Sequence, residues 1–291
     1  VLGGASVCDG CGHGQAASAE LTAELMGAVC TTMAVGTRCG RFVDTPLGVL
    51  EAALAVVQAQ AGTSVASAVW LLTVGAQAAR GPAHAGAWGL ARAVRAEALL
   101  ALRCVDGSAA VVVAGGAWLD EPEAMLPVGS AGRLPRLVHL PRLAGVRAAL
   151  GATTHLVAGG TAGLGLLTAR WLAHCGAAAL ALASRRGVLA HDTTPEWAQL
   201  HVAGTATLVQ RRDTAELTHV EQLTALTRGA LAACGMWHAA GVLADSVLLN
   251  QAAKALAMVH APKAEGAGLL QRASASAPLC ALVLFSSVAA L

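Results

Sequence analysis

Four glycines, at positions 159, 160, 163 and 165, follow directly after a short apolar run at residues 155–158. The run has the composition of a buried parallel strand, and residues 166–175 have apolar side chains at helical spacing. Backbone that lacks Cβ atoms can approach a pyrophosphate closely, and the free N–H groups at the start of the helix then bind the anion. The stretch therefore predicts a dinucleotide-binding turn, although its Gly-x-x-x-Gly-x-Gly spacing departs from the commoner Gly-x-Gly-x-x-Gly pattern.

Positive charge follows the next apolar run, residues 178–183, which we interpret as the second strand. That strand leads into Ser184, Arg185 and Arg186, where many NAD enzymes have an acidic residue that holds the ribose hydroxyl groups. A serine and two arginines favour instead the 2′-phosphate of NADP. A glycine-rich turn without a ligand is the alternative, but the preceding strand, the following helix and the basic pair favour a dinucleotide.

Later strands are also followed by residues that could contact a nucleotide. Asp213 follows the third strand and either accepts a hydrogen bond from an adenine amino group or caps the next helix. The small residues Ala239, Ala240 and Gly241 follow the fourth strand and leave room for a ribose. The third, fourth and fifth strands are expected at 206–210, 235–238 and 279–285.

Three further polar residues are candidates for chemistry. Ser286 and Ser287 lie at the carboxyl end of the fifth strand, the edge at which open α/β sheets place their active sites. Lys263 lies in a helical region at 254–272. Each alone would more often be structural, as a solvated lysine or a hydroxyl that caps a turn, but together they favour a site.

The first half of the chain also alternates strands and helices, but it has no glycine-rich phosphate turn. Helices are expected at 20–33, 46–60 and 85–100, strands at 38–43, 65–74, 102–105 and 109–114, and a looser section at 115–133. We therefore expect an α/β fold: a Rossmann-like, doubly wound parallel sheet preceded by a smaller, truncated Rossmann-like subdomain. Residues 1–150 would be structural, with a poorly patterned N-terminus, and residues 151–291 would be the NADP-binding part, incomplete at its C-terminus.

The composition excludes several classes of function. The net charge is only +2, and no run of Lys and Arg suggests nucleic acid. No signal peptide or membrane helix is predicted, and the eight cysteines are typical of reduced thiols, so we expect a cytoplasmic protein. Cys8 and Cys11 have zinc-ligand spacing, but Cys30 and Cys39 complete no common pattern, so we expect no metal. The chain does not begin with methionine, and we expect it to be an excerpt of a longer protein.

These residues together resemble the ketoreductase domain of modular polyketide synthases and animal-type fatty acid synthases, a relative of the short-chain dehydrogenases/reductases. The resemblance covers about residues 45–291. In the second half it rests on the stretches 158–165, 184–187, 237–243, 261–263 and 284–289. In the first half it rests on the fainter marks Trp70-Leu-Leu-Thr73, Ala87-Trp-Gly-Leu-Ala-Arg92 and Leu134-Pro-Arg-Leu137.

The resemblance implies a role for each matching position. The pyrophosphate would be held by Gly159, Thr161, Gly163, Leu164 and Gly165. The 2′-phosphate would be held by Ser184, Arg185 and Arg186, the adenine by Asp213, and the ribose region by residues 239–241. Lys263 would be the catalytic lysine, and Ser287 would hydrogen-bond the substrate ketone.

The implied reaction is hydride transfer from NADPH to a β-ketoacyl group on an acyl carrier protein, which gives a β-hydroxyacyl thioester. Neighbouring synthase domains would be further partners. The family's catalytic tyrosine lies about 13 residues beyond the serine, but this chain stops at Leu291 and contains no tyrosine. We therefore expect the polypeptide itself to be inactive, and a non-catalytic scaffold is the alternative. Ala158 replaces a usual threonine, and residues 243–245 read Leu-Ala-Asp where Leu-Asp-Asp is common.

Overall fold

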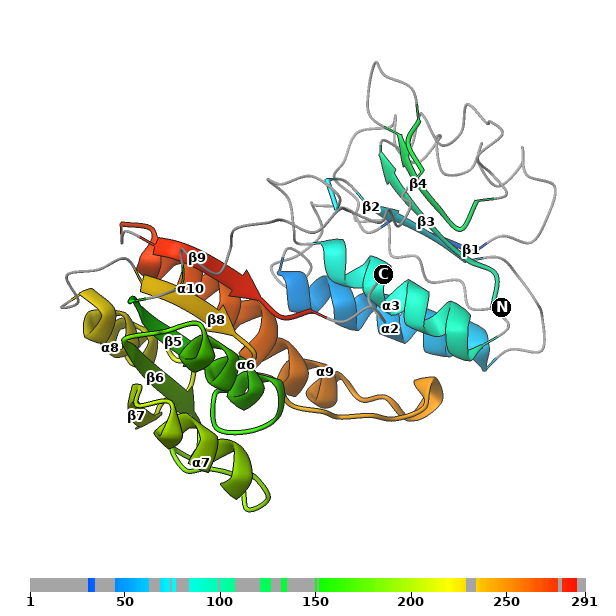
Figure 1. The fold of residues 1–291 in the computed structure, drawn as a ribbon. Helices are drawn as coiled ribbons and strands as arrows, with labels where there is room; N and C mark the ends of the chain where they lie inside the picture. Colours follow the sequence, from blue (N-terminus) through cyan, green and yellow to red (C-terminus); the bar gives the residue numbers. More distant parts are fainter. Residues whose placement is uncertain are drawn as a thin grey trace. The chain divides into compact units, whose positions relative to one another are not determined.

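The computed structural model describes residues 31–34, 45–62, 69–73, 75–76, 84–98, 100–107, 121–126, 132–134, 150, 152–228, 234–276 and 279–286. The chain divides into two compact units, each built on a parallel sheet (Figure 1). The first unit comprises residues 1–139 together with 245–256 and 287–291, and the second comprises 140–244 and 257–286. The segment 245–256 therefore lies with the first unit, although both of its neighbours in the chain belong to the second.

The sheet of the second unit has the strand order β7-β6-β5-β8-β9, with all pairs parallel. The order changes direction between β5 and β8, and such a switch point opens a crevice at the carboxyl ends of the strands. The strands are β5 (Thr154–Ala158), β6 (Ala179–Ser184), β7 (Ala206–Arg211), β8 (Cys234–His238) and β9 (Leu279–Leu284).

Helices cover both faces of this sheet. Val157, Leu180 and Leu182 pack with α6 (Gly163–His174) and α7 (Thr194–Val202) on one face. Their neighbours along the same strands, such as Leu156 and Ala181, pack with α8 (Leu217–Arg228) and α10 (Gly266–Ser274) on the other. Because side chains alternate across a strand, strands that are apolar throughout must be buried on both faces. The predicted doubly wound Rossmann-like sheet is thus confirmed.

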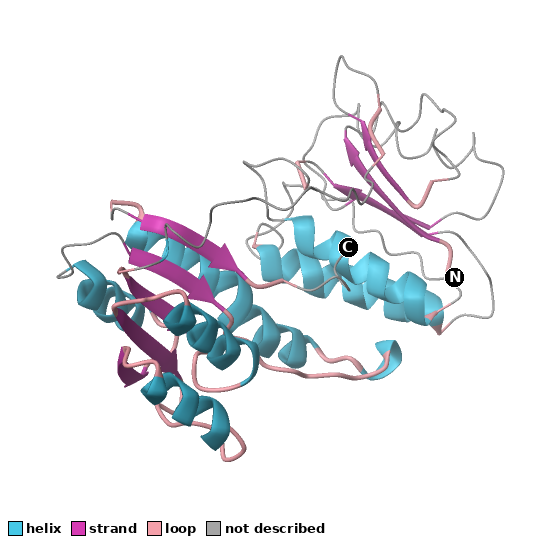
Figure 2. Ribbon diagram, viewed as in Figure 1, coloured by secondary structure: helices cyan, strands magenta, loops and turns pink. Residues whose placement is uncertain are grey.

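The first unit is simpler, with strand order β1-β2-β3-β4 and all pairs parallel. The strands are β1 (Thr31–Ala34), β2 (Val69–Thr73), β3 (Leu102–Gly107) and β4 (Glu123–Leu126). Right-handed crossovers that always step in one direction place their helices on one face. Accordingly α2 (Pro46–Ala61) and α3 (Ala85–Glu97) pack together against the sheet in one core (Figure 2).

Two local predictions for the first unit were wrong. Residues 31–33, expected at the end of a helix, lie in β1, where Thr31 and Thr32 pair with β2. Residues 123–126, expected in a loose section, form β4 beside β3. In both places pairing with a neighbouring strand decides the conformation, which local periodicity cannot reveal. The strands predicted at 38–43 and 109–114 lie outside the described residues.

The segment 245–256 docks on the two helices of the first unit. It contains a short 3₁₀ helix, η3 (Leu248–Asn250), and Leu248 is buried in the core that α2 and α3 form. The Gln58 side chain donates to the carbonyl groups of Leu248 and Gln251, both at 2.8 Å. The Glu97 carboxylate accepts from the Leu248 amide at 2.6 Å. The helix α9 (Ala253–His260) follows, and the division between the units falls within it.

Candidate functional site

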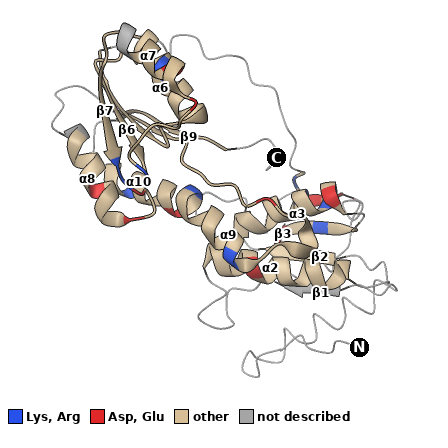
Figure 3. Ribbon diagram, turned by 90° about the horizontal axis from the view of Figure 1, so that it is seen from below, with Lys and Arg blue, Asp and Glu red and all other residues tan. Residues whose placement is uncertain are grey.

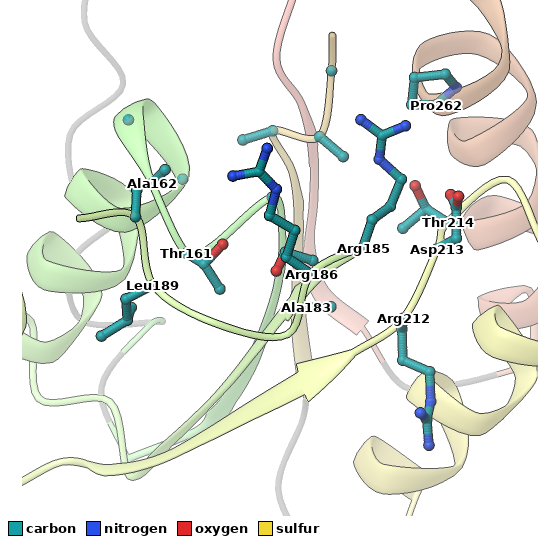
Figure 4. A pocket seen from close by; sticks show the side chains of 18 of the residues that line it. Thr161, Ala162, Ala183, Arg185, Arg186, Leu189, Arg212, Asp213, Thr214 and Pro262 are labelled. Carbon is teal, nitrogen blue, oxygen red and sulfur yellow. The ribbon is translucent and has the colours of Figure 1, made fainter. Parts of the chain in front are cut away.

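A pocket of about 460 Å³ lies at the carboxyl ends of β5, β6 and β8, at the switch point of the second sheet. Its wall includes the glycine turn after β5, the residues that follow β6, and residues 239–241 after β8. Asp213 and Pro262 also line it (Figure 4). Three stretches predicted from separate parts of the sequence therefore meet at one cavity.

The glycine turn is so closely packed that a side chain at Gly159 or Gly165 would clash with the backbone. Gly159 has a φ of +77°, and a Cβ there would lie 2.7 Å from the Ala240 amide nitrogen. A Cβ on Gly165 would lie 2.1 Å from the Gly159 carbonyl oxygen. The turn is fixed to β6 through the Gly159 amide, which donates to the Ala183 carbonyl at 2.8 Å. The absence of side chains thus both allows this packing and leaves bare backbone at the pocket.

The helix α6 begins at the pocket with Gly163, Leu164 and Gly165 on its wall. Ala162 precedes the helix and provides no side-chain cap. The amide groups of a first helical turn are free donors with a partial positive charge, so they favour an anion. Thr161 is buried in the turn, and its carbonyl accepts from the Ala190 amide at 3.3 Å.

The predicted basic pair follows β6 in a tight turn. The Ser184 hydroxyl accepts from the Gly187 amide at 3.1 Å, and the Ser184 carbonyl accepts from the Arg212 amide at 2.9 Å. Arg185 and Arg186 project from this turn with exposed side chains. In Figure 4 both guanidinium groups extend to the same side of the turn, whereas Arg212 points the opposite way. Blue residues consequently gather where β6 and β7 end in Figure 3.

The Asp213 side chain closes a turn before α8 and does not cap that helix, which begins at Leu217. One carboxylate oxygen, Oδ1, accepts from the Ala215 amide at 3.0 Å, just before α8. The Asp213 backbone amide in turn donates to Nδ1 of His219 at 3.1 Å. Because Asp213 also lines the pocket, this hydrogen bond holds its carboxylate at the wall. Its contact with adenine stays a prediction.

Lys263 lies beside the pocket in a turn that the sequence did not predict. Residues Ala261–Glu265 form one turn of π-helix, η4, between α9 and α10. The Lys263 ammonium group donates to the carbonyl of Phe285 at 3.2 Å, at the end of β9. Its stem passes close to Gly241, where a Cβ would lie 2.7 Å from Cε. Ser286 follows Phe285 and is exposed, whereas Ser287 lies outside the described residues.

The residues at the pocket fit a dinucleotide phosphate. Bare glycine backbone, an uncapped helix N-terminus and two exposed guanidinium groups are the donors that phosphate groups require. A doubly wound parallel sheet with such a pocket at its switch point defines the Rossmann class of nucleotide-binding proteins.

Comparison with known proteins narrows this class. The family model of the KR domain matches residues 153–291. The polyketide synthase GfsB of Streptomyces halstedii is 35% identical over 269 residues, and erythronolide synthase EryA3 of Saccharopolyspora erythraea is 34% identical over 226 residues. These alignments cover 82% and 72% of this chain but only 5% and 7% of those synthases.

Solved structures agree with the sequence comparison. The A-type ketoreductases from a modular polyketide synthase superpose with a TM-score of 0.74 at 27% identity, over 94% of this chain and 63% of theirs. An A1-type ketoreductase gives the same TM-score at 28% identity, over 94% of this chain and 62% of its own. The chain belongs to the ketoreductase domains of modular polyketide synthases. Such domains are nicotinamide-dependent oxidoreductases with a Rossmann-like fold.

Proposed function

We propose that this chain is the part of a β-ketoacyl reductase that binds NADPH and presents it to a β-ketoacyl thioester held on an acyl carrier protein. The product would be the β-hydroxyacyl thioester. The observation that supports this most directly is the pocket wall, where the glycine turn, the basic pair and residues 239–241 come together. The cofactor supplies the hydride when it is bound.

Each part of the wall would have its own task in binding. Gly159, Gly163 and Gly165, with Thr161 and Leu164, would hold the pyrophosphate at the start of α6. Ser184, Arg185 and Arg186 would bind the 2′-phosphate, Asp213 would accept from the adenine, and residues 239–241 would pass beside the ribose. The ammonium group of Lys263, held beside Gly241, would donate hydrogen bonds to the ribose hydroxyls.

Reduction of a ketone also needs a group that stabilises the developing alkoxide and a group that gives a proton. We assign the first role to Ser287, which follows β9 in the sequence after Phe285 and Ser286. The second belongs to a tyrosine in the family, and these 291 residues contain none. Phenylalanine, the nearest side chain in shape, lacks the hydroxyl group of tyrosine and cannot give a proton. We therefore propose that this polypeptide binds the cofactor but does not reduce a ketone. The alternative is a ketoreductase-like domain that serves a synthase as a scaffold, which Ala158 in place of the usual threonine would favour.

The relatives are polyketide synthases many times longer than this chain. We therefore propose that the partners of this chain are the acyl carrier protein and the neighbouring synthase domains. We also propose that the protein works in the cytoplasm. Among the helices that the structure describes, none has the length and apolar character to cross a bilayer.

Cofactor titration tests this proposal. We expect NADPH to bind the 291-residue chain more tightly than NADH, as measured by the fluorescence of the reduced nicotinamide. A double variant, Arg185→Ser with Arg186→Ser, should raise the dissociation constant for NADPH by about tenfold to a hundredfold, because charge-assisted hydrogen bonds are lost. Its affinity for NADH should stay unchanged.

The matched control is Arg170→Ser. Arg170 is an arginine of the same unit, but its guanidinium donates to Gln199 at 2.8 Å and takes no part in the pocket wall. This variant should bind NADPH as the parent chain does. Equal affinity of the parent chain for NADPH and NADH, or binding of neither, would refute the assignment. A measurable rate of NADPH oxidation with a β-ketoacyl thioester would show instead that another residue gives the proton.

A further inference from the structure

His238, the last residue of β8, is a buried histidine at the edge of the site. Only 2% of it is exposed, and its Nε2 lies 2.8 Å from the carbonyl oxygen of Pro262. Because a carbonyl can only accept, Nε2 must carry the proton and donate. The other ring nitrogen, Nδ1, is buried and has no hydrogen-bond partner among the described residues.

The acceptor of this bond belongs to the π-helical turn that contains Lys263. Pro262 precedes Lys263 directly, and a proline cannot donate a backbone hydrogen bond within a helix. A π-turn pairs each carbonyl with the amide five residues on, and so departs from the regular pattern of the helices beside it. The imidazole of His238 therefore bonds to a carbonyl at the point where the helix is irregular.

His238 also holds the strand on the opposite side of the lysine. Its backbone carbonyl accepts from the amide of Phe285 at 3.0 Å, and the carbonyl of Phe285 accepts from the Lys263 ammonium group at 3.2 Å. A closed ring of hydrogen bonds thus connects His238, the turn at Pro262 and Lys263, and Phe285. Phe285 is followed directly by Ser286 and Ser287.

We propose that His238 is a positioning residue, whose Nε2–H holds the π-turn so that the Lys263 ammonium group stands at the ribose side of the pocket. The proposal rests on the proposed function, since it takes Lys263 as a cofactor-binding residue. Burial lowers the pKa of His238, the Pro262 carbonyl opposes this, and the nearby Lys263 charge adds to the lowering. The lowered pKa favours the neutral imidazole, which donates from Nε2 alone.

The neighbouring strand provides a matched control. His155 in β5 is fully buried as well, and its Nε2 lies 3.0 Å from the Leu150 carbonyl. Its Nδ1 accepts from the indole N–H of Trp237 at 3.3 Å. However, His155 stands near the amino end of β5 and does not line the pocket. Replacing it should destabilise the same unit without any effect on Lys263.

The test is a double-mutant cycle on the NADPH dissociation constant. His238→Leu removes the donor and should raise this constant by about fivefold to tenfold, the worth of about one hydrogen bond. Lys263→Ala should raise it by a similar factor, and the two changes together by no more than Lys263→Ala alone, because His238 acts through the lysine. His155→Leu should leave the constant within about twofold.

Two polar replacements keep the test valid if His238→Leu does not fold. A Gln at 238 can place its amide nitrogen near the position of Nε2, whereas an Asn reaches only the position of Nδ1. We expect His238→Gln to bind NADPH like the parent chain and His238→Asn to bind about fivefold more weakly. Without any cofactor, hydrogen exchange of residues 261–266 should be faster in His238→Asn than in His238→Gln, while β6 exchanges equally in both.

The outcomes separate the two proposals. If Lys263→Ala binds NADPH as the parent chain does, the assignment of Lys263 fails. If Lys263→Ala weakens binding but His238→Asn and His238→Gln behave alike, His238 is only a packed histidine and the inference is overturned. Additive effects in the cycle would also overturn it. Faster exchange at 261–266 in His238→Asn alone supports the positioning role even where NADPH does not bind.

Discussion

At the scale of single residues, the site depends on glycines, which have no Cβ atom. Gly165 is a helical residue, where alanine would ordinarily stabilise the helix by up to about 1 kcal/mol. The Gly159 carbonyl lies where the Cβ of an alanine at position 165 would be. Because this carbonyl belongs to the backbone, it cannot rotate away. The requirement for glycine at 165 is therefore steric, and it comes from the turn rather than from the helix.

This requirement predicts that Gly165→Ala raises the dissociation constant for NADPH at least tenfold and lowers the free energy of unfolding by about 1–3 kcal/mol through overpacking. Gly89 in α3 is the control, because a Cβ there meets no atom within 4 Å. Gly89→Ala should raise the thermal midpoint slightly and leave binding intact. Tight NADPH binding by Gly165→Ala would show that the turn can rearrange.

At the scale of elements, the segment 245–256 is held by side-chain hydrogen bonds and by the apolar contacts of Leu248 and Leu256 with the core of the first unit. Gln58 is its main anchor, since one amide group satisfies two carbonyl groups, those of Leu248 and Gln251. Only Leu248 adds a buried apolar contact from η3. The chain leaves the pocket wall at Gly241 and returns to it near Pro262, so the docked segment is the connection between two parts of the site.

We therefore expect Gln58→Leu to free this segment. Two carbonyl groups lose their donor, and the free energy of unfolding of the first unit should fall by about 1–3 kcal/mol. Hydrogen exchange of residues 245–256 should accelerate more than that of α3. Ala55→Leu, at an exposed position of the same helix, should change neither quantity. Unchanged exchange in Gln58→Leu would mean that the apolar contact of Leu248 suffices.

Elements with a strong local pattern were predicted well, and those that depend on distant partners were not. The apolar run before the glycines and the basic pair after the next strand indicated β5, β6 and the turn between them to within a residue or two. The docking of 245–256 depends on Gln58, which lies 190 residues before Leu248, and the local sequence around Leu248 does not indicate this contact. The π-turn was missed because Pro262 in a helical pattern indicates irregularity but not its kind.

At the scale of the whole molecule, the described residues at the carboxyl edges of the two sheets have different surroundings. In the second unit that edge opens into the pocket. In the first, buried Asp106 at the end of β3 accepts from the Thr73 hydroxyl at 3.1 Å and from the Ala76 amide at 3.0 Å. The Trp88 indole donates to the same hydroxyl at 3.0 Å. Among the described residues, these side chains thus pair with one another at the carboxyl ends of β2 and β3.

The buried ionisable groups also differ between the units, and so should their response to acid. In the second unit, burial lowers the pKa values of His155 and His238 from 6.5, against opposing hydrogen bonds to carbonyls. In the first, burial raises the pKa of Glu123, but hydrogen bonds from Arg92, both at 2.7 Å, and from Arg95 outweigh it, and the pKa lies below 4.5. All three groups resist protonation in the folded chain, but in the unfolded chain the histidines take up protons near pH 6.5 and the glutamate only near pH 4.5.

Acid should therefore unfold the second unit first. Below pH 6.5 the unfolded chain takes up protons that the folded histidines refuse, so the second unit loses up to about 1.4 kcal/mol per pH unit for each histidine. The contribution of Glu123 is present above pH 4.5 and declines only as the pH falls below that value. Hydrogen exchange between pH 7 and pH 5 should accelerate in β5 and β8 before it does in β2 and β3. A variant with His155→Gln and His238→Gln should flatten this dependence, and equal acceleration in both sheets would contradict it.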